Sequence, residues 1–598
     1  MGRRVDAIVI YRGILFVLEY KVGEADFSTS AIDQAVGYAL DLKNFHEASH
    51  DRTIVPIVVA TRGADHAYEF TLAADGVAGP LCTNGQKLAH LISECASRWE
   101  GSQLDAHEWS RGRYKPTPTI IEAAQALYAK HDVLEISRSE AGAENLTVTA
   151  KYIGGIIDEA KKNDTKCILF LTGVPGSGKT LAGLNIANQR MKAQDDEHGV
   201  FLSGNGPLVK VLREALVQDA LRQPLVVEAQ PRSRAVEQRN AEAFIQNIHH
   251  FRDDNLGTDQ PPINRAVLFD EAQRAWNVER LREFMKQRHG IANFNMSEPA
   301  YLLSVMDRRR GWCCVVCLVG EGQEIGRGEA GISEWFDALQ EGFPDWQMHL
   351  SPDVIERTSA EVTERKSAAK ALVDSGRAVR ALALHLSVSI RSFRAERLSE
   401  FVGAVIEGQA CTAREIASAL GHFDLRITRD LGRAREWVRQ KRRGTERAGL
   451  LASSNALRLK PHGIHVKVEI DPALWFLAPR EDVRSSDALE DVATEFDVQG
   501  LELDWACVCW DANFRRSADN WGCYAFRGTK WQSVRDPYRQ SYIANTYRVL
   551  LTRARQGMVI FVSHGDANDK TRPASFYDGT YDFLVACGLR PLEADYSP

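Results

Sequence analysis

Gly173-Val174-Pro175-Gly176-Ser177-Gly178-Lys179-Thr180 is the stretch of sequence that decides the fold. It follows the apolar run 167–171 and precedes the helix-like run 181–187, and a strand, a glycine-rich loop and a helix in this order bind phosphate. The glycines let main-chain N–H groups surround the phosphate oxygens, and the helix N-terminus adds a partial positive charge. Lys179 should reach the β- and γ-phosphates, and Thr180 should give its hydroxyl to Mg²⁺. The stretch therefore predicts ATP and Mg²⁺ as cofactors, bound by Gly173, Pro175, Gly176, Ser177, Gly178, Lys179 and Thr180.

Length, charge and composition limit the rest. With 598 residues the chain is too long for one hydrophobic core, and the usual domain size suggests about three or four domains. The formal net charge is −6 and the pI is near 6.3, so a nucleic-acid partner would have to bind local basic surfaces. The 11 cysteines are scattered, no signal segment opens the chain, and no apolar run approaches the roughly 18 residues of a membrane span. We therefore expect a cytoplasmic protein with no membrane partner.

The N-terminal residues contain a pair of carboxylates and a lysine. Residues 5–21 are typical of two strands joined by a tight turn at Arg12-Gly13. In such a hairpin Asp6 lies at the far end of the first strand and Glu19 near the far end of the second, and Lys21 shares a face with Glu19. Two converging carboxylates can hold Mg²⁺, and a neighbouring lysine can position or activate the attacking water. These are the parts needed to hydrolyse a phosphodiester.

A predicted helix at residues 31–40 follows, and it carries Gln34 and Tyr38 one turn apart on one face. The order Asp, Glu-x-Lys, Gln-x-x-x-Tyr resembles the PD-(D/E)xK nucleases, and the Gln–Tyr pair is similar to their RecB-type branch. This resemblance implies a role for five residues: Asp6 and Glu19 as metal ligands, Lys21 as the catalytic lysine, and Gln34 and Tyr38 as accessory site residues.

The N-terminal pattern departs from that family at its start. Met1 lies almost on the first strand, whereas family members have a helix and often a further acidic residue before it. The sequence therefore leaves three readings of residues 1–96 open: a truncated nuclease domain, a degenerate one, or a structural domain whose charges are solvated. The polar residues 97–145 are expected to form a linker with a short helix.

A second acidic motif follows the phosphate loop. The apolar run 266–269 leads into Asp270-Glu271-Ala272-Gln273, and ligands bind at such strand ends in open α/β sheets. We expect Asp270 to bind the Mg²⁺ that bridges the phosphates, and Glu271 to orient or deprotonate the attacking water. Gln273, and Gln323 at the end of the next strand, are placed to contact the γ-phosphate.

The motifs taken in order resemble those of superfamily 1 helicases. The matching residues are 173–180 (motif I), 203–207 (Ia), 270–273 (II), 320–323 (III), Arg391 (IV), 499–502 (V) and 552–554 (VI). More narrowly, residues 204–208, 270–276 and 545–553 are similar to the Schlafen-type DNA/RNA helicase domain. The resemblance covers roughly residue 145 to the C-terminus. It implies an α/β fold of two RecA-like P-loop NTPase lobes, 146–385 and 386–598, which follow a small restriction-endonuclease-like α/β domain.

The helicase resemblance also implies roles for residues of the second lobe. A motor needs its phosphate-holding lobe and its charge-compensating arginines on different bodies, so that hydrolysis changes the free energy of lobe closure. Arg391 and Arg553 are the candidates to stabilise charge on the transferred phosphoryl group, and structural salt bridges are the alternative. Gly500 and Glu502 of motif V are expected at the nucleotide site.

A basic stretch, about residues 399–483, is expected as an insertion in the second lobe. The arginines at 426, 429, 433 and 435 are expected on a helical surface beside Trp437 and Arg439. Basic groups beside an aromatic ring can follow a phosphate backbone and stack on a base. A solvated helix face is the alternative.

Two functional hypotheses follow. The first is an ATP-driven translocase or helicase of single-stranded DNA or RNA that carries an Mg²⁺-dependent nuclease-like domain. A nuclease fused to a motor suggests restriction of foreign nucleic acid or repair. The second is an ATP-switched nucleic-acid sensor or scaffold with a degenerate nuclease domain and no unwinding. A plain P-loop kinase would leave motifs V and VI without a purpose.

Overall fold

The computed structural model describes residues 5–64, 67–73, 75–99, 101–112, 119–128, 140–174, 176–193, 197–222, 233–320, 331–356, 372–387, 393–421, 423–517 and 520–592. The chain divides into two compact units. One comprises Met1–Pro118, Arg435–Ala448 and Leu503–Trp505, and the other comprises Thr119–Ala434, Gly449–Glu502 and Ala506–Pro598. Among the described residues, no helix is long and apolar enough to cross a bilayer.

The N-terminal domain is built on the predicted hairpin. Strands β1 (Ala7–Tyr11) and β2 (Ile14–Lys21) pair antiparallel, and both turn residues, Arg12 and Gly13, have positive φ angles of 49° and 75°. A Cβ on Gly13 would lie 2.0 Å from the carbonyl oxygen of Ser102, so only glycine fits there. The turn type and the right-handed twist of the strands thus fix the hairpin register.

Two parallel strands extend the hairpin into a four-stranded sheet. Helix α1 (Thr29–Phe45) connects β2 to β3 (Ile54–Ala60), and β4 (Leu81–Thr83) pairs parallel with β3. Alternate residues of β2 enter two cores: Phe16 packs with α2 (Leu88–Arg98), and Val17 packs with α1. Because apolar cores cover both faces of the sheet, the sequences of β2 and β3 are nearly continuous apolar runs.

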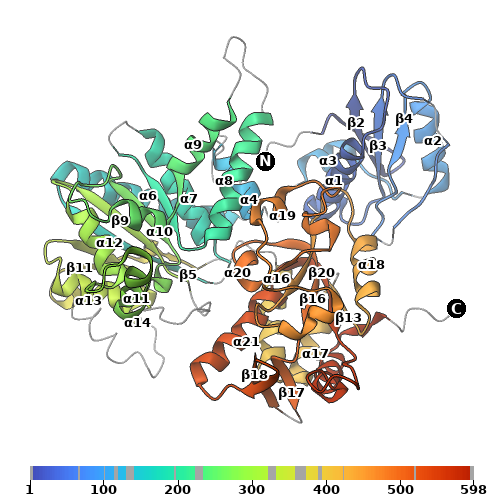
Figure 1. The fold of residues 1–598 in the computed structure, drawn as a ribbon. Helices are drawn as coiled ribbons and strands as arrows, with labels where there is room; N and C mark the ends of the chain where they lie inside the picture. The colour runs from blue at the N-terminus through green and yellow to red at the C-terminus, as the bar shows by residue number, and fades with distance from the viewer. Residues whose placement is uncertain are drawn as a thin grey trace. The chain divides into compact units, whose positions relative to one another are not determined.

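The first lobe contains an eight-stranded sheet in the order β11-β10-β5-β9-β8-β6-β7, with β12 paired to β5, and every pairing is parallel. Helix α6 (Glu140–Asn163) and helix α7 (Lys179–Ala193) pack against the sheet (Figure 1). The strands are β5 (Lys166–Gly173), β6 (Val200–Ser203), β7 (Ile245–Asn247), β8 (Ala266–Asp270), β9 (Cys313–Leu318), β10 (Gln347–Leu350), β11 (Ala378–Arg380) and β12 (His385–Leu386). Because β5, β9 and β8 are neighbours, the loops after them meet at one edge.

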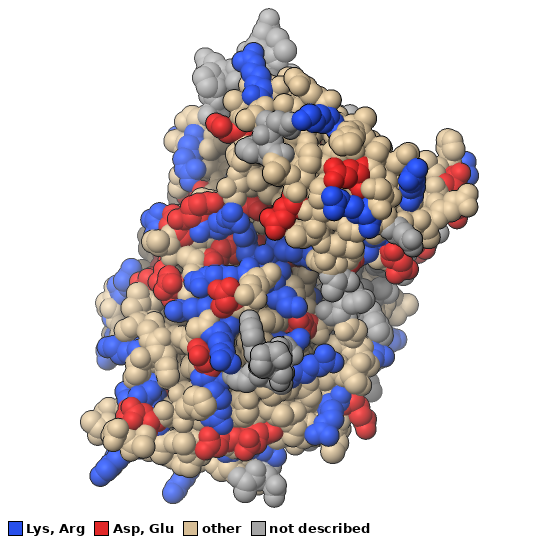
Figure 2. Space-filling model, turned by 90° about the vertical axis from the view of Figure 1, so that its right-hand side faces the viewer, with Lys and Arg blue, Asp and Glu red and all other residues tan. Residues whose placement is uncertain are grey.

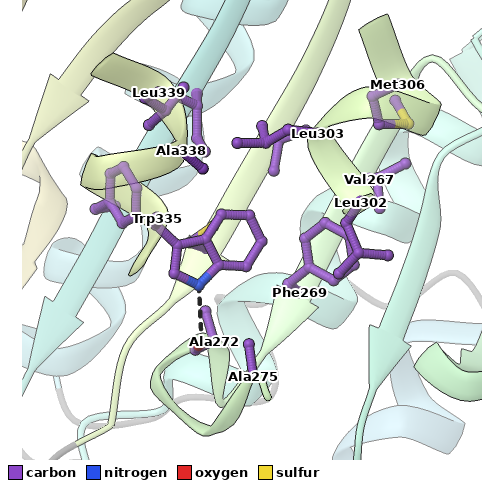
Figure 3. Packing of buried hydrophobic residues seen from close by; sticks show 14 of the residues in the cluster. Val267, Phe269, Ala272, Ala275, Leu302, Leu303, Met306, Trp335, Ala338 and Leu339 are labelled. Atoms are coloured by element: carbon purple, nitrogen blue, oxygen red, sulfur yellow. Dashed lines mark hydrogen bonds between the residues drawn. The ribbon is translucent and has the colours of Figure 1, made fainter. Parts of the chain in front are cut away.

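A buried tryptophan ties the loop after β8 to the lobe core. Trp335 of α13 (Ser333–Glu341) packs against Phe269 with ring centroids 5.5 Å apart. Its Nε1 donates a 2.9 Å hydrogen bond to the carbonyl oxygen of Ala272 (Figure 3). Leu302, Leu303 and other residues of α12 (Glu298–Asp307) complete the cluster. The loop is therefore anchored by both apolar burial and a main-chain hydrogen bond.

The second lobe has a six-stranded sheet in the order β15-β14-β16-β20-β13-β21. The strands are β13 (Asp424–Thr428), β14 (Ala448–Ala452), β15 (Val492–Ala493), β16 (Leu503–Trp510), β20 (Ala554–Val562) and β21 (Arg590–Pro591). The stretch 399–483 supplies β13 and β14, so it contributes to the framework of this sheet. A separate antiparallel sheet consists of β17 (Phe514–Ser517), β18 (Asn520–Arg527) and β19 (Lys530–Ser533). The fold is thus α/β, with two RecA-like lobes after a small α/β domain.

Candidate nucleotide site and N-terminal carboxylate site

The phosphate loop joins β5 to α7 with backbone angles that require glycine. Gly176 and Gly178 have φ angles of 76° and 84°. A Cβ on Gly173 would lie 2.5 Å from Ser177 Oγ and 2.7 Å from Leu386 Cβ, which leaves no room for a side chain. Pro175 lies outside the described residues. The glycines therefore shape the loop as the sequence predicts.

Polar groups of this loop fit the oxygens of a nucleotide phosphate. Lys179 Nζ donates hydrogen bonds to the carbonyl oxygens of Gly173 at 2.8 Å and Val174 at 3.4 Å. The hydroxyl of Ser177 is buried and has no hydrogen-bond partner. An unpaired buried hydroxyl costs about 1–3 kcal/mol, and a phosphate oxygen would satisfy it.

Two oxygen ligands suitable for Mg²⁺ lie together where the loop meets β8. Thr180 Oγ1 donates a 3.2 Å hydrogen bond to Asp270 Oδ1. Burial, and then the neighbouring Glu271, raise the pKa of the Asp270 carboxyl to about 7, although Thr180 and Lys179 act in the opposite direction. Mg²⁺ binds oxygen ligands and favours the ionised carboxylate, so this pair of residues fits the metal.

Glu271 is held in an uncommon conformation. Its φ of 53° lies in the left-handed region, which costs a residue with a side chain about 1–2 kcal/mol. Gln273 Nε2 donates a hydrogen bond to Glu271 Oε2, and the main-chain N–H of Gly320 donates to Gln273 Oε1 at 2.8 Å. A Cβ on Gly320 would lie 2.6 Å from Glu271 Oε2. Gln273 thus connects the ends of β8 and β9 and orients the Glu271 carboxylate.

The motif V loop, residues 499–502, lies against the first lobe. Arg274 NH1 donates to Gln499 Oε1 at 2.6 Å, and Asn205 Nδ2 donates to the carbonyl oxygen of Gln499 at 2.6 Å. Gly500 has a φ of 77°, and Glu502 Oε2 lies 3.9 Å from the guanidinium of Arg555. From the sequence, Gln499 falls in motif V, Asn205 in motif Ia and Arg274 in the stretch 270–276, but no individual role follows for them. The available signal was that Arg274 directly follows Gln273 and that Asn205 follows a strand end.

Arg553 is held at the junction between α21 (Pro537–Leu551) and the motif V loop. It is 5% exposed, and its guanidinium donates to the carbonyl oxygens of Val549 at 3.0 Å and Leu501 at 3.2 Å. The described contacts therefore place it beside motif V. Gln323 and Arg391, the other two residues expected to contact the phosphates, lie outside the described residues.

The N-terminal domain brings together the residues of the nuclease-like pattern. Lys21 Nζ donates to Glu19 Oε1 at 3.0 Å and to Gln34 Oε1 at 3.1 Å. Gln34 Nε2 in turn donates to Tyr38 Oη at 2.9 Å. A continuous chain of hydrogen bonds thus joins the end of β2 to one face of α1.

Asp6 and Glu19 lie on neighbouring positions of the hairpin. Ala7 pairs with Leu18, so Asp6 lies beside Glu19, and its Oδ2 accepts a 2.8 Å hydrogen bond from the N–H of Tyr20. Glu19 is 4% exposed, and its Oε2 has no hydrogen-bond partner. Burial raises the pKa of Glu19, while Lys21 lowers it and Asp6 raises it. A buried carboxylate oxygen without a donor, beside a second carboxylate, fits a bound cation. Within the described parts of the chain, no group of three or more His, Cys, Asp or Glu side chains is placed to hold a metal.

Three residues of the basic stretch, Arg426, Arg429 and Trp437, are engaged within the protein. The expected helix is wrong for the first two arginines, because Arg426 lies in β13 and Arg429 precedes α18 (Leu431–Lys441). Arg429 donates to Asp578 and to the carbonyl oxygen of Ser563, both at 2.9 Å. Trp437 is buried, and it packs edge-to-face against Trp505 at 5.6 Å, so its ring is not free to stack on a base. Figure 2 shows that Lys and Arg are interspersed with Asp and Glu over the face it presents.

Comparisons with known proteins agree with the order of motifs. The family model described as Schlafen group 3, DNA/RNA helicase domain, matches residues 166–564. None of the curated proteins compared with the chain matches it. A solved structure, the Hef helicase domain of Pyrococcus furiosus, is 13% identical and aligns over 70% of this chain and 96% of its own. Its TM-score is 0.24, which is too low to support a shared mechanism.

Proposed function

Because the chain belongs to the Schlafen group 3 DNA/RNA helicase domain family, we propose that it is an ATP-driven, superfamily 1 type translocase or helicase of single-stranded DNA or RNA. Its 11 free cysteines are compatible with the reducing cytoplasm, where we place it. We also propose that the N-terminal domain is an Mg²⁺-dependent nuclease.

The single observation that carries the motor proposal is the convergence of motifs I and II, and of Gly320 from motif III, at one edge of the first sheet. Thr180 and Asp270 supply oxygen ligands 3.2 Å apart, and Glu271 lies at the adjacent position of the chain. Bound Mg²⁺ would neutralise charge on the phosphates. Lys179 would exchange its carbonyl partners for phosphate oxygens, which bind an ammonium more strongly.

Glu271 is the residue that would act on the attacking water. Its carboxylate is oriented by Gln273, and Gly320 leaves the space that this carboxylate occupies. A carboxylate held in this way can accept a proton or a hydrogen bond from water in line with the γ-phosphate. Arg553, which borders the motif V loop, is the second-lobe group that would stabilise charge on the phosphoryl group once the lobes close. Closure of the two lobes on a nucleic-acid strand, followed by their reopening after hydrolysis, would move the nucleic acid.

ATP hydrolysis in Mg²⁺, measured with and without single-stranded DNA or RNA, tests the motor. We expect strong stimulation by one polymer and a loss of at least about 100-fold in kcat in Glu271→Gln, which keeps the shape of the side chain and removes the base. Glu279→Gln, on the nearby helix α11 (Val278–His289), is a control for the same chemical change. Hydrolysis indifferent to every nucleic acid would contradict the translocase and favour the ATP-switched sensor or scaffold.

The nuclease proposal is carried by the buried, unpaired Oε2 of Glu19 beside Asp6 and Lys21. Cleavage of a labelled strand in Mg²⁺ tests it. We expect cleavage to be lost in Glu19→Gln and Lys21→Ala and kept in Glu24→Gln, whose carboxylate is exposed in the same domain. An uncut strand with the wild-type protein would identify a degenerate domain. Cleavage together with motor activity would support a role in restriction of foreign nucleic acid or in repair.

A further inference from the structure

Gln499 makes two hydrogen bonds to residues that are far from it in the sequence. Its Oε1 accepts from Arg274, 225 residues away, and its main-chain carbonyl oxygen accepts from Asn205, 294 residues away. Arg274 ends the short 3₁₀ helix Ala272–Arg274 after β8, and Asn205 follows β6. One residue of the second lobe is therefore fixed by two adjacent strand ends of the first lobe.

The orientation of the Gln499 amide is settled by its partner. Arginine only donates hydrogen bonds, so the atom facing Arg274 is the oxygen, and Nε2 is the other end of the amide. Gln499 is 5% exposed, and Nε2 is buried without a hydrogen-bond partner. Leaving a buried donor unpaired is unfavourable, and the contact persists because Arg274 and Asn205 together over-determine it. A contact that carries such a cost is suited to a junction that forms and breaks.

The residues on either side of Gln499 lead to the two ends of the nucleotide site. On one side, Arg274 follows Gln273, which orients the Glu271 carboxylate. On the other side, Leu501 O accepts from Arg553 at 3.2 Å. A Cβ on Gly500 would lie 3.2 Å from Leu208 Cδ2, so the loop runs close to α8 (Gly206–Arg222).

We propose that Gln499 is a positioning residue that couples the acidic loop of the first lobe to Arg553 and the second lobe. The inference rests on the proposed function. Movement of the loop that carries Glu271 would shift Arg274, and through Gln499 it would move the motif V loop that holds Arg553. The contact to Asn205 extends the same coupling to α8. Asn205 caps the N-terminal turn of this helix, because its Oδ1 accepts a 3.2 Å hydrogen bond from the N–H of Leu208. The element with two arrangements is the junction of Gln499 with Arg274 and Asn205, whose hydrogen bonds are either formed or broken.

Steady-state ATP hydrolysis by the full chain, with and without single-stranded DNA or RNA, tests the coupling. Gln499→Met keeps the volume of the side chain and removes the acceptor. We expect its basal kcat and its KM for ATP to stay within about twofold, and its stimulation by nucleic acid to fall by about tenfold or more, the usual effect of losing a charged hydrogen bond. Gln499→Glu, which keeps an acceptor for Arg274, should retain the stimulation.

A matched control uses another contact between the same lobes. Lys210 and Asp471 form an exposed ion pair at 2.9 Å, which contributes little because solvent screens it. Lys210→Ala should keep the full stimulation. The double variant Arg274→Met/Gln499→Met should lose no more stimulation than Arg274→Met alone, since the hydrogen bond between the two side chains is already absent in that single variant.

The possible outcomes separate the inference from the proposed function. If nucleic acid does not stimulate the wild-type protein, the proposed function fails, and the inference fails with it. If it does, but Gln499→Met is stimulated equally, only the inference fails. A variant that loses basal hydrolysis or shifts its KM also overturns the inference, because Gln499 would then act in catalysis or binding. Should Gln499→Met not fold, Arg274→Met removes the same hydrogen bond, and it must lower the stimulation at least as much.

Discussion

Replacing Asp270 by Asn should make the nucleotide-free protein more stable while it abolishes hydrolysis. Asp270 is 6% exposed, and burial together with Glu271 raises the pKa of its carboxyl to about 7. In the unfolded chain the same group ionises near pH 3.8. Between these two values the folded protein binds one proton more than the unfolded chain, so its stability falls as the pH rises. Above about pH 7 the full cost of the ionised carboxylate is present.

The magnitude follows from the pKa difference. A change from 3.8 to about 7 is about 3 units, and at about 1.36 kcal/mol per unit the ionised carboxylate costs at most about 4 kcal/mol. Asn has the shape of the protonated acid and does not ionise, so Asp270→Asn recovers this free energy. Half of it, about 2 kcal/mol, corresponds to about 4–8 °C in the Tm of a domain of 150–250 residues.

Thermal unfolding in EDTA at pH 5 and pH 8 measures the effect. We expect Asp270→Asn to raise the Tm at pH 8 and to raise it less at pH 5, where the wild-type carboxyl is protonated in the folded protein. Asp259→Asn makes the same change at an exposed position of the same lobe, and it should leave the Tm unchanged. Mg²⁺ with ADP should stabilise the wild type more than Asp270→Asn. A variant that is no more stable than the wild type at pH 8 would refute the reasoning.

Three further substitutions test other parts of the structure. Arg252 and Glu298 form a fully buried ion pair at 3.1 Å, so Arg252→Met should lower the free energy of unfolding by about 3–5 kcal/mol in denaturant unfolding. The double variant Arg252→Met/Glu298→Leu should recover most of this loss, and additive losses in the double variant would contradict the prediction. Gly320→Ala should lower the single-turnover rate of hydrolysis by about tenfold or more, because its Cβ would lie 2.6 Å from Glu271 Oε2, and an unchanged rate would refute the orienting role. Gly13→Ala should destabilise the N-terminal domain by at least about 1–2 kcal/mol in urea unfolding, because its φ is 75°, and an unaffected midpoint would show that the turn relaxes.

The parts of the site that lie within a few residues of one another could be predicted from the sequence. The phosphate loop follows from the strand, loop and helix pattern around Lys179, and the 3.2 Å contact of Thr180 with Asp270 agrees with it. Likewise, the two-residue turn set the hairpin, and the period-two geometry of β2 placed Glu19 and Lys21 on one face, 3.0 Å apart. Local backbone geometry fixes these relations, whatever the rest of the chain does.

Contacts between distant segments could not be predicted in this way. The pattern at residues 499–502 indicated motif V, but nothing local shows that Gln499 accepts from Arg274. The partner of Arg429 in the basic stretch could not be predicted for the same reason: the sequence shows the charge of Arg429 but not Asp578, 149 residues away, which pairs with it. The sequence does not distinguish an aromatic residue that faces solvent from one that is packed, as Trp437 is against Trp505. Tertiary pairing decides both cases.

Several unfavourable features lie at the sites that would hold ligands, and their chemistry explains why they persist. The hydroxyl of Ser177 and the Oε2 of Glu19 are buried without partners, and Glu271 has a left-handed backbone. A bound phosphate would give the Ser177 hydroxyl a hydrogen-bond partner, a bound cation would do the same for Glu19 Oε2, and the Glu271 backbone would aim its carboxylate at a water molecule. The free energy that each feature costs the free protein would therefore be recovered in the complex. The unpaired Nε2 of Gln499 belongs to the same class, although it lies between the lobes. In the proposed coupling this cost would be present only while the junction is closed, so it would lower the free energy needed to open the junction.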